Sequence, residues 1–269
     1  MRYLINGRQE AGISPLDRGL AYGDGVFRTL RMRAGSPLWW QDHFQTLSHD
    51  CAALDLVCPE QALLLDEINV LTREWPDCVV KIIVTRGEGV RGYRQPVIAS
   101  STRIVMVSPL PNYEEVSIHG VILRWCKLRL ARQPALAGIK HLNRLENILA
   151  RKEWDDPHIA EGLLCDDTNA VIGGTMTNIF LMRDGCVYTP DLSQNGIEGV
   201  ARLRVLRAAR QHGIETKVQR LGASDVLQAD EVLLSNSIVG IWRVAQLDGR
   251  QWEPAGWAKK FRHWIDEAN

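Results

Sequence analysis

Alternating and helix-periodic runs of apolar residues divide the first half of this chain into short strands and helices. The runs at residues 3–6, 26–32, 78–85, 103–108 and 116–124 are rich in β-branched and apolar residues, which predicts strands. Apolar residues recur with helical spacing at 41–54 and from 59 towards 74, which predicts two helices. We therefore expect a mixed α+β arrangement here.

The second half has the same mixed character. Helices are predicted at 141–153 and 200–212, after Ser224 and after Pro254, and short strands at 162–165, 178–182, 186–189, 214–218 and 231–234. Residues 127–138 lack sustained periodicity and contain a proline, as interdomain connections often do. The predicted division is a small α+β domain at 1–126, a linker at 127–138 and a larger α/β domain at 139–269.

Composition narrows the classes of partner. The hydrophobic fraction of 45% is typical of a soluble globular protein, and 32 basic residues balance 32 acidic ones. Because the charges cancel, no long-range electrostatic field would attract nucleic acid or an anionic membrane. No apolar run approaches the roughly 20 residues that a membrane span requires. The six cysteines are scattered without a Cys-x-x-Cys pair, and the first residues indicate a strand rather than a secretory leader. We expect a cytoplasmic protein with a small-molecule partner.

The segment GEGVRG at 87–92 matches the G-x-G-x-x-G pattern of dinucleotide-binding proteins. That pattern must open a helix whose N-terminus receives the pyrophosphate, whereas the residues that follow here do not propagate a helix. A mobile glycine-rich hairpin loop is the simpler interpretation. Such loops often carry function, and Arg91, Tyr93 and Arg94 are the side chains that this one offers to a substrate.

Three longer stretches occur in order along the chain: YGDGVF at 22–27, TRGEGVRGY at 85–93 and GIKHLNRLE at 138–146. With TNIF at 177–180 and DEV at 230–232, they make nearly the whole chain resemble the aminodeoxychorismate lyases, relatives of the branched-chain and D-amino acid aminotransferases. The resemblance implies a two-domain α/β protein of the type-IV pyridoxal-phosphate fold, a homodimer, and pyridoxal 5'-phosphate bound between the domains.

Lys140 is the residue that the resemblance assigns to the cofactor. A lone lysine is most often a solvated surface residue. Here Ile139 and Leu142 flank it where the predicted linker turns into a helix. Such an apolar setting would desolvate the amine and lower its pKa, as a Schiff-base lysine requires. Lys140 is therefore predicted to hold the cofactor and, once released by the substrate, to act as the catalytic base.

Two segments are predicted to hold the cofactor phosphate. GIEGVAR at 196–202 is a glycine turn leading into a helix, where free N–H groups and the helix dipole favour an anion. By similarity, the amides of Val200 and Ala201 contact phosphate. SNSI at 235–238 matches the family's second phosphate loop, which implicates Ser237 and Ile238, although a small-residue loop after a strand is by itself more often a simple turn.

The chain also departs from the family pattern. Thr46 stands where relatives carry an arginine to the phosphate, and Gly173 where they place a glutamate against the pyridine nitrogen. Arg28 occupies a position that is glutamate in many relatives. The simpler interpretation is a solvated strand residue, and the alternative is partial replacement of the missing charge near the phosphate.

The predicted activity is conversion of 4-amino-4-deoxychorismate to 4-aminobenzoate and pyruvate for folate synthesis. Arg91 and Tyr93 are predicted to contact substrate carboxylates, and Thr29 to face the pocket. No histidines have metal-ligand spacing, so no metal is expected. An aminotransferase of the same fold is disfavoured by Gly173 and by Leu145, which replaces the tyrosine of branched-chain enzymes. A relative that has lost the cofactor and acts as a binding protein is the remaining alternative.

Overall fold

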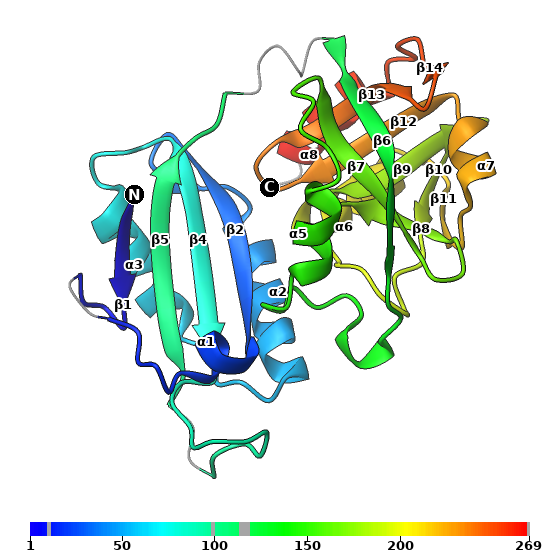
Figure 1. The fold of residues 1–269 in the computed structure, drawn as a ribbon. Helices are drawn as coiled ribbons and strands as arrows, with labels where there is room; N and C mark the ends of the chain where they lie inside the picture. Colours follow the sequence, from blue (N-terminus) through cyan, green and yellow to red (C-terminus); the bar gives the residue numbers. More distant parts are fainter. Residues whose placement is uncertain (10–11, 98–99, 113–118, 268–269) are drawn as a thin grey trace. The chain divides into compact units, whose positions relative to one another are not determined.

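The computed structural model describes residues 1–9, 12–97, 100–112 and 119–267, and it divides into two compact units (Figure 1). Unit 1 consists of Met1–Pro111 and Ile139–Asn143. Unit 2 consists of Asn112–Gly138 and Arg144–Asn269. The chain therefore leaves unit 1, starts unit 2, and returns to unit 1 for one short segment that includes Lys140.

Unit 1 is built on a five-stranded antiparallel sheet in the order β1-β5-β4-β2-β3. Its strands are β1 (Arg2–Ile5), β2 (Gly25–Arg33), β3 (Ser36–Pro37), β4 (Cys78–Thr85) and β5 (Thr102–Pro109). The helices are α1 (Arg18–Tyr22), α2 (Trp40–Ala53) and α3 (Gln61–Thr72). Asp17 caps α1 by accepting hydrogen bonds from the amides of the first turn.

The two faces of this sheet differ because successive side chains of a strand point to opposite sides. Val26 and Leu30 of β2 are fully buried in one hydrophobic core with Leu47 of α2 and Ile68 of α3. Side chains at alternate positions, such as that of Thr29, lie on the opposite face and are partly exposed. That second face is accessible for binding.

Unit 2 contains a mixed nine-stranded sheet in the order β11-β10-β9-β12-β13-β6-β7-β8, with β14 paired to β13. Its strands are β6 (Val121–Leu130), β7 (Ile159–Asp166), β8 (Val171–Gly174), β9 (Asn178–Arg183), β10 (Cys186–Pro190), β11 (Thr216–Gln219), β12 (Glu231–Asn236), β13 (Gly240–Leu247) and β14 (Arg250–Gln251). The helices are α5 (Leu145–Arg151), α6 (Val200–Gln211), α7 (Ala223–Leu227) and α8 (Trp257–Glu267), with a 3-10 turn at Pro134–Leu136. Among the described residues of this unit, buried apolar side chains gather in clusters that include Leu163 and Trp242 in one case and Leu164 and Trp154 in another.

The observed division differs from the predicted one at 1–126, 127–138 and 139–269. Strand β6 runs through the start of the predicted linker and pairs in parallel with β7 and β13, so residues 121–130 belong to unit 2. Leu123, Cys126 and Leu130 are buried, while basic residues occupy positions between them and mask the apolar pattern. At the other end, residues 139–143 belong to unit 1.

Candidate active site

Lys140 lies on the edge of β2 and not in a helix. The Phe27 amide donates a hydrogen bond to the Lys140 carbonyl at 3.0 Å, and the Leu142 amide donates to the Gly25 carbonyl at 2.9 Å. His141 forms a bridge with Val26 in the antiparallel sense. The predicted helix at 141–153 therefore begins only at Leu145, because residues 140–142 use their main-chain groups to extend the sheet.

A buried pair of charges lies beneath the Lys140 main chain. The Lys140 amide donates to Asp50 Oδ2 on α2 at 3.1 Å, and the same oxygen accepts a short hydrogen bond from Arg28 Nη2. Arg28 is 2% exposed and Asp50 is 1% exposed. The interpretation of Arg28 as a solvated strand residue is therefore wrong: its position in β2 alternates with the open face and points towards α2.

The Lys140 side chain extends over the open face of the sheet. Its Nζ lies 4.6 Å from the centre of the Phe27 ring, and Nζ of Lys81 lies 4.8 Å from the same centre. Thr29 is opposite Lys81 in the β2–β4 register, so the predicted pocket residue lies on this face. Burial lowers the pKa of Lys81. Unit 1 thus brings two amines, an aromatic ring and a hydroxyl-bearing residue to one surface.

The sequence reasoning missed Lys81. The signal was present, because Lys81 is the one charged residue within the apolar run of β4. A charged side chain in a central strand needs either a partner or a function. Its cation–π contact with Phe27 supplies part of that explanation.

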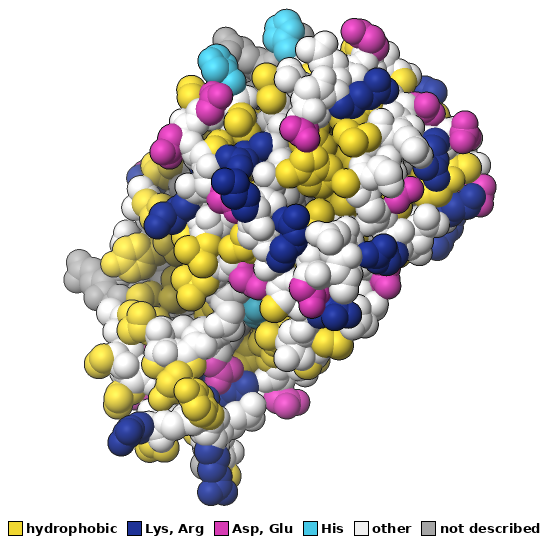
Figure 2. All heavy atoms as spheres, turned by 45° about the vertical axis from the view of Figure 1, so that its right-hand side comes forward, with side chains coloured by type: hydrophobic (Ala, Val, Ile, Leu, Met, Phe, Trp, Pro, Cys, Tyr) yellow, Lys and Arg dark blue, Asp and Glu magenta, His cyan; other side chains and the backbone are white. Residues whose placement is uncertain are grey.

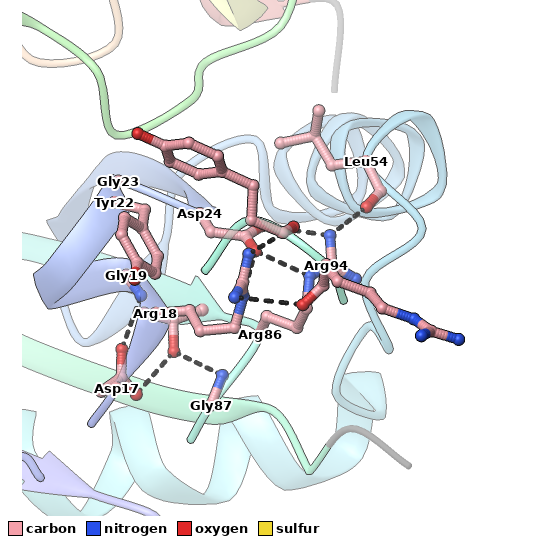
Figure 3. Close-up of polar contacts among 12 residues, drawn as sticks. Asp17, Arg18, Gly19, Tyr22, Gly23, Asp24, Leu54, Arg86, Gly87 and Arg94 are labelled. Carbon is pink, nitrogen blue, oxygen red and sulfur yellow. Dashed lines mark hydrogen bonds and ion pairs between the residues drawn. The ribbon is translucent and has the colours of Figure 1, made fainter. Parts of the chain in front are cut away.

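A network around Asp24 fixes the glycine-rich loop between β4 and β5 (Figure 3). Arg18 Nε and Arg86 Nε both donate to Asp24 Oδ2, at 2.9 and 2.8 Å. Burial raises the pKa of Asp24, but hydrogen bonds from the two arginines outweigh it and bring the pKa below its ordinary value. Arg18 also donates to the carbonyls of Gly92 and Tyr93, at 2.9 and 3.2 Å. The loop backbone is therefore held in place.

The side chains of this loop remain open to solvent. Arg91 is exposed, and Tyr93 is 86% exposed, with its ring 5.5 Å from that of Tyr22 in an edge-to-face arrangement. The hairpin is confirmed, since β4 and β5 pair along their full length. The expectation that its loop is mobile is not supported, because Arg18 holds the carbonyls of Gly92 and Tyr93. The predicted substrate residues Arg91 and Tyr93 thus extend from a braced loop.

In unit 2, the glycine turn at 196–199 leads directly into α6. Gly199 is the N-cap residue and provides no side-chain cap. In the part of the chain that the structure describes, no hydrogen bond occupies the amides of Val200 and Ala201, the first two residues of the helix. These two amides are therefore available to an anion, as predicted for a phosphate site.

Asn178 connects the two segments that were predicted to hold phosphate. Its Nδ2 donates to the Ile197 carbonyl at 2.9 Å, and its main chain is opposite Ser235 in the β9–β12 register. Ser237 follows in the turn after β12, and its hydroxyl makes no hydrogen bond to any described residue. The amide of Ile238 donates to Asn236 Oδ1 at 2.9 Å, so it is already engaged.

Several buried polar groups beside these segments have no partner among the described residues. Asn195 precedes the glycine turn and is 6% exposed, yet neither polar atom of its amide is hydrogen-bonded. The Ser235 hydroxyl and Arg202 Nε are buried and also lack a hydrogen bond. Buried polar groups without partners are uncommon in folded proteins, and they are expected where a polar ligand binds.

Thr46 and Gly173, the two predicted departures from the family pattern, have clear local surroundings in the structure. The Thr46 hydroxyl donates to the Asp42 carbonyl of its own helix at 2.6 Å. Gly173 is buried in β8, and a Cβ atom there would lie 2.7 Å from the Thr177 carbonyl oxygen, so the backbone leaves no room for a side chain. The nearby carboxylate of Glu161 accepts hydrogen bonds from Gly162, Thr175, Met176 and Thr177.

The described residues lack two further features. They contain no cluster of three or more histidine, cysteine or acidic side chains arranged to hold a metal ion. Within the same residues, no helix combines the length and apolar character that crossing a membrane requires.

Comparison with known proteins places these features in a family. The chain matches the family model for amino-transferase class IV over residues 25–247. It is 33% identical over 240 residues to an aminodeoxychorismate lyase of Vibrio harveyi, covering 89% of each protein.

Solved structures agree. A 4-amino-4-deoxychorismate lyase from Pseudomonas aeruginosa superposes with a TM-score of 0.93 at 42% identity, over 99% of this chain and 98% of that one. A hypothetical aminotransferase from Mycobacterium tuberculosis, solved in the PLP-bound form, gives a TM-score of 0.86. The superposition covers 100% of this chain and 98% of that one, and at 21% identity it shows that the two share a fold. The predicted fold class and resemblance are confirmed, and the chain belongs to the class IV amino-transferase family.

Proposed function

We propose that this protein is a lyase that uses pyridoxal phosphate to convert 4-amino-4-deoxychorismate to 4-aminobenzoate and pyruvate. The similarity to the Pseudomonas aeruginosa lyase over nearly the full length of both chains is the observation that carries the proposal. The open face of unit 1 supports it, because Lys140 and Lys81 offer one amine for covalent chemistry and a second for an anionic substrate.

The residues present fit the family's cofactor. The open amides of Val200 and Ala201 and the Ser237 hydroxyl suit a phosphate, and the unpartnered polar atoms of Asn195 are consistent with a polar ligand. Lys140 would hold the cofactor through its amine. When bound, pyridoxal phosphate supplies an aldehyde that joins to an amine and a ring that accepts electrons.

Within unit 2, the glycine turn is hydrogen-bonded to Gly138. The Gly138 amide donates to the Gly196 carbonyl at 3.1 Å, and the Glu198 amide donates to the Gly138 carbonyl at 2.9 Å. Gly138 precedes Lys140 by two residues in the sequence.

Lys140 is proposed to act as the base of the reaction. Its Nζ would accept the proton from C4 of the substrate, while the cofactor, when bound, would withdraw electrons from that carbon. The electron pair of the broken C4–H bond would make the ring aromatic as the C3–O bond breaks, and the leaving enolpyruvate would take up a proton to become pyruvate. The contact between Nζ and the Phe27 ring keeps the amine on the open face of the sheet.

Cationic groups are proposed to bind the two carboxylates of the substrate. Lys81 lies beside Lys140 on the same face, and Arg91 extends from the loop braced by Arg18. Tyr93 and Thr29 offer hydroxyl groups for hydrogen bonds. We assign Lys81 the larger contribution, because its partial burial strengthens its interaction with an anion.

The absence of a side chain at Gly173 favours the lyase over an aminotransferase. A carboxylate beside the pyridine nitrogen would keep that nitrogen protonated and stabilise a carbanion, on which transamination depends heavily. Gly173 has no space for one, and the oxygens of Glu161 already accept hydrogen bonds from residues 162 and 175–177. Aromatisation of the product ring supplies a driving force that transamination lacks.

The experiment is a product assay with the purified protein and pyridoxal phosphate. With 4-amino-4-deoxychorismate, the proposal expects equimolar 4-aminobenzoate and pyruvate, and no products from the Lys140→Ala variant. With D-alanine or a branched-chain amino acid plus 2-oxoglutarate, it expects no new amino acid. Transamination without release of 4-aminobenzoate would show that the protein is an aminotransferase and not a lyase. If the protein bound no cofactor at all, the enzyme assignment would be wrong and the binding-protein alternative would stand.

We also propose that the enzyme is a homodimer of the cytoplasm. Helix α5 exposes Leu145, Ile148 and Leu149 by 72, 54 and 53%, and contiguous exposed apolar groups of this kind mark protein contacts. All six cysteines are free thiols, which suits a reducing compartment. Basic and acidic side chains are intermixed on the face drawn in Figure 2, which favours a small-molecule partner over nucleic acid.

A further inference from the structure

Arg28 and Asp50 form a pair of charges inside the core of unit 1. Arg28 follows Val26 and precedes Leu30 on the side of β2 that packs against α2, and both of those neighbours are fully buried. The side chains of the pair are 3 and 1% exposed. Moving two charges into such an environment costs free energy that their attraction only partly offsets, so stability alone does not explain this pair.

The pair is joined to the main chain of Lys140. Asp50 Oδ2 accepts from Arg28 Nη2 and from the Lys140 amide, so a single carboxylate oxygen connects α2, β2 and the lysine segment. On the other side of the residue, the Lys140 carbonyl accepts from the Phe27 amide at 3.0 Å. Both main-chain polar groups of Lys140 are thus held, one by the sheet and one by Asp50.

These bonds determine where the lysine side chain begins. A hydrogen bond to an ionised acceptor is stronger than one to a neutral acceptor, and the bond from Arg28 keeps Asp50 oriented towards the Lys140 amide. With its main chain fixed, Lys140 extends its side chain across the open face to Phe27. A displacement of about 1 Å at a reacting group is enough to slow an enzyme substantially.

We propose that Asp50 is a positioning residue for the cofactor lysine and that Arg28 serves as its buried counter-ion. The inference rests on the proposed function, because it takes Lys140 as the residue that bonds to pyridoxal phosphate. Arg28 holds the Asp50 carboxylate in place, and Asp50 in turn holds the main chain of Lys140.

The test compares two cofactor forms in two double variants. Arg28→Met with Asp50→Ala removes the charges and the acceptor, while Arg28→Met with Asp50→Asn removes the charges and keeps an acceptor oxygen. Pyridoxal phosphate bonds to the lysine, whereas pyridoxamine phosphate has no aldehyde and binds without it. Kd is measured for each form by absorbance titration, and borohydride reduction followed by peptide mass spectrometry identifies the bonded lysine.

The expected result is selective. The variant without an acceptor should bind pyridoxal phosphate about tenfold more weakly, the loss expected for a charged hydrogen bond, with pyridoxamine phosphate affinity unchanged within about twofold. The variant that carries Asp50→Asn should recover most of the loss. Glu67→Gln is the matched control, since Glu67 is 5% exposed and pairs with Arg103 in the same unit. It should change neither affinity.

Two results would overturn the proposal: equal weakening of both cofactor forms, or unchanged affinity for pyridoxal phosphate. Should the variant without an acceptor not fold, hydrogen exchange of the Lys140 amide in the unmodified chain decides, because an amide bound to Asp50 is protected and unprotected exchange contradicts the bond. Failure of the proposed function is visible separately, as absence of a borohydride-stable adduct on Lys140 in the unmodified chain.

Discussion

Two ammonium groups approach one aromatic ring at the centre of the candidate site. Lys140 and Lys81 come from different segments of unit 1, and their Nζ atoms lie 4.6 and 4.8 Å from the centre of the Phe27 ring. The ring attracts both cations, while the two charges repel each other. In the proposed function the Lys140 amine bonds to the cofactor, so Lys81 is the ammonium group of this pair that attracts a substrate carboxylate.

The first residue-scale prediction concerns Lys81→Met. Loss of one ammonium should raise KM for the substrate by about tenfold while kcat changes by no more than about twofold, because a carboxylate contact contributes to ground-state and transition-state binding alike. Steady-state kinetics measures both constants. Lys81→Arg keeps the charge and should restore much of the affinity. A fall in kcat with KM unchanged would assign Lys81 to the chemical step.

The lowered pKa of Lys81 predicts a pH dependence. Burial favours the neutral amine, so the folded protein loses this proton at a lower pH than an ordinary lysine does. Substrate binding should therefore weaken as pH rises through that lowered pKa. In the unfolded chain Lys81 keeps its proton up to its ordinary, higher pKa. Between the two pKa values, the contribution of Lys81 to the free energy of unfolding therefore rises with pH. A KM–pH profile of the unmodified enzyme beside Lys81→Arg, whose charge persists, measures the effect; identical profiles would contradict it.

The strands differ in how clearly the sequence pattern predicts them. Strand β4 has the bounds that were predicted, because its apolar run is uninterrupted except at Lys81. Strands β8 and β13 were not predicted. The first is four residues long and ends in two glycines, and the second mixes polar with apolar residues, so neither has a clear period of two.

The same reasoning explains which parts of the site were predictable. Lys140 and the glycine turn before α6 were predicted from a motif and from a turn leading into a helix. Asp50 was not, because its role depends on α2 lying below the edge of β2 and on a hydrogen bond that spans 90 residues of sequence. Residue type and local spacing do not encode a contact of this kind.

Arg18 holds the glycine-rich loop, so its removal should make the loop more accessible to a protease. Arg18→Met removes the donor to the Gly92 and Tyr93 carbonyls and should free the loop, so that trypsin cleaves after Arg91 or Arg94 at least about tenfold faster. Limited proteolysis followed by mass spectrometry measures the rate. Arg2→Ala, which removes an exposed pair with Glu74, is the control and should cleave at the original rate. Equal rates in the Arg18→Met variant and the unmodified chain would mean that other contacts hold the loop.

In the whole molecule, the chain passes from unit 1 to unit 2, returns to unit 1 for one short segment and then completes unit 2. Residues 139–143 belong to unit 1, although the residues on both sides of them belong to unit 2. Lys140, the proposed cofactor lysine, thus belongs to the same unit as Lys81 and the glycine-rich loop, while the glycine turn belongs to the other unit. The predicted linear division failed because a sequence pattern cannot show that a chain returns to an earlier sheet.

The exposed apolar face of α5 predicts the assembly. Ile148→Lys places a charge among exposed aliphatic side chains and should convert a dimer to a monomer, as measured by light scattering after size-exclusion chromatography. Val70→Lys is the control, because Val70 is 67% exposed on α3 of the other unit and should tolerate the charge. A dimer of unchanged stability in the Ile148→Lys variant would exclude α5 from the interface.

The most direct test of the central claim is to identify the lysine that bonds to the cofactor. The protein is incubated with pyridoxal phosphate, reduced with borohydride and digested, and the modified peptide is sequenced by mass spectrometry. We expect a single adduct on Lys140, lost in Lys140→Ala and retained in Lys81→Met. An adduct on Lys81, whose Nζ lies over the same ring, or no adduct at all, would contradict it.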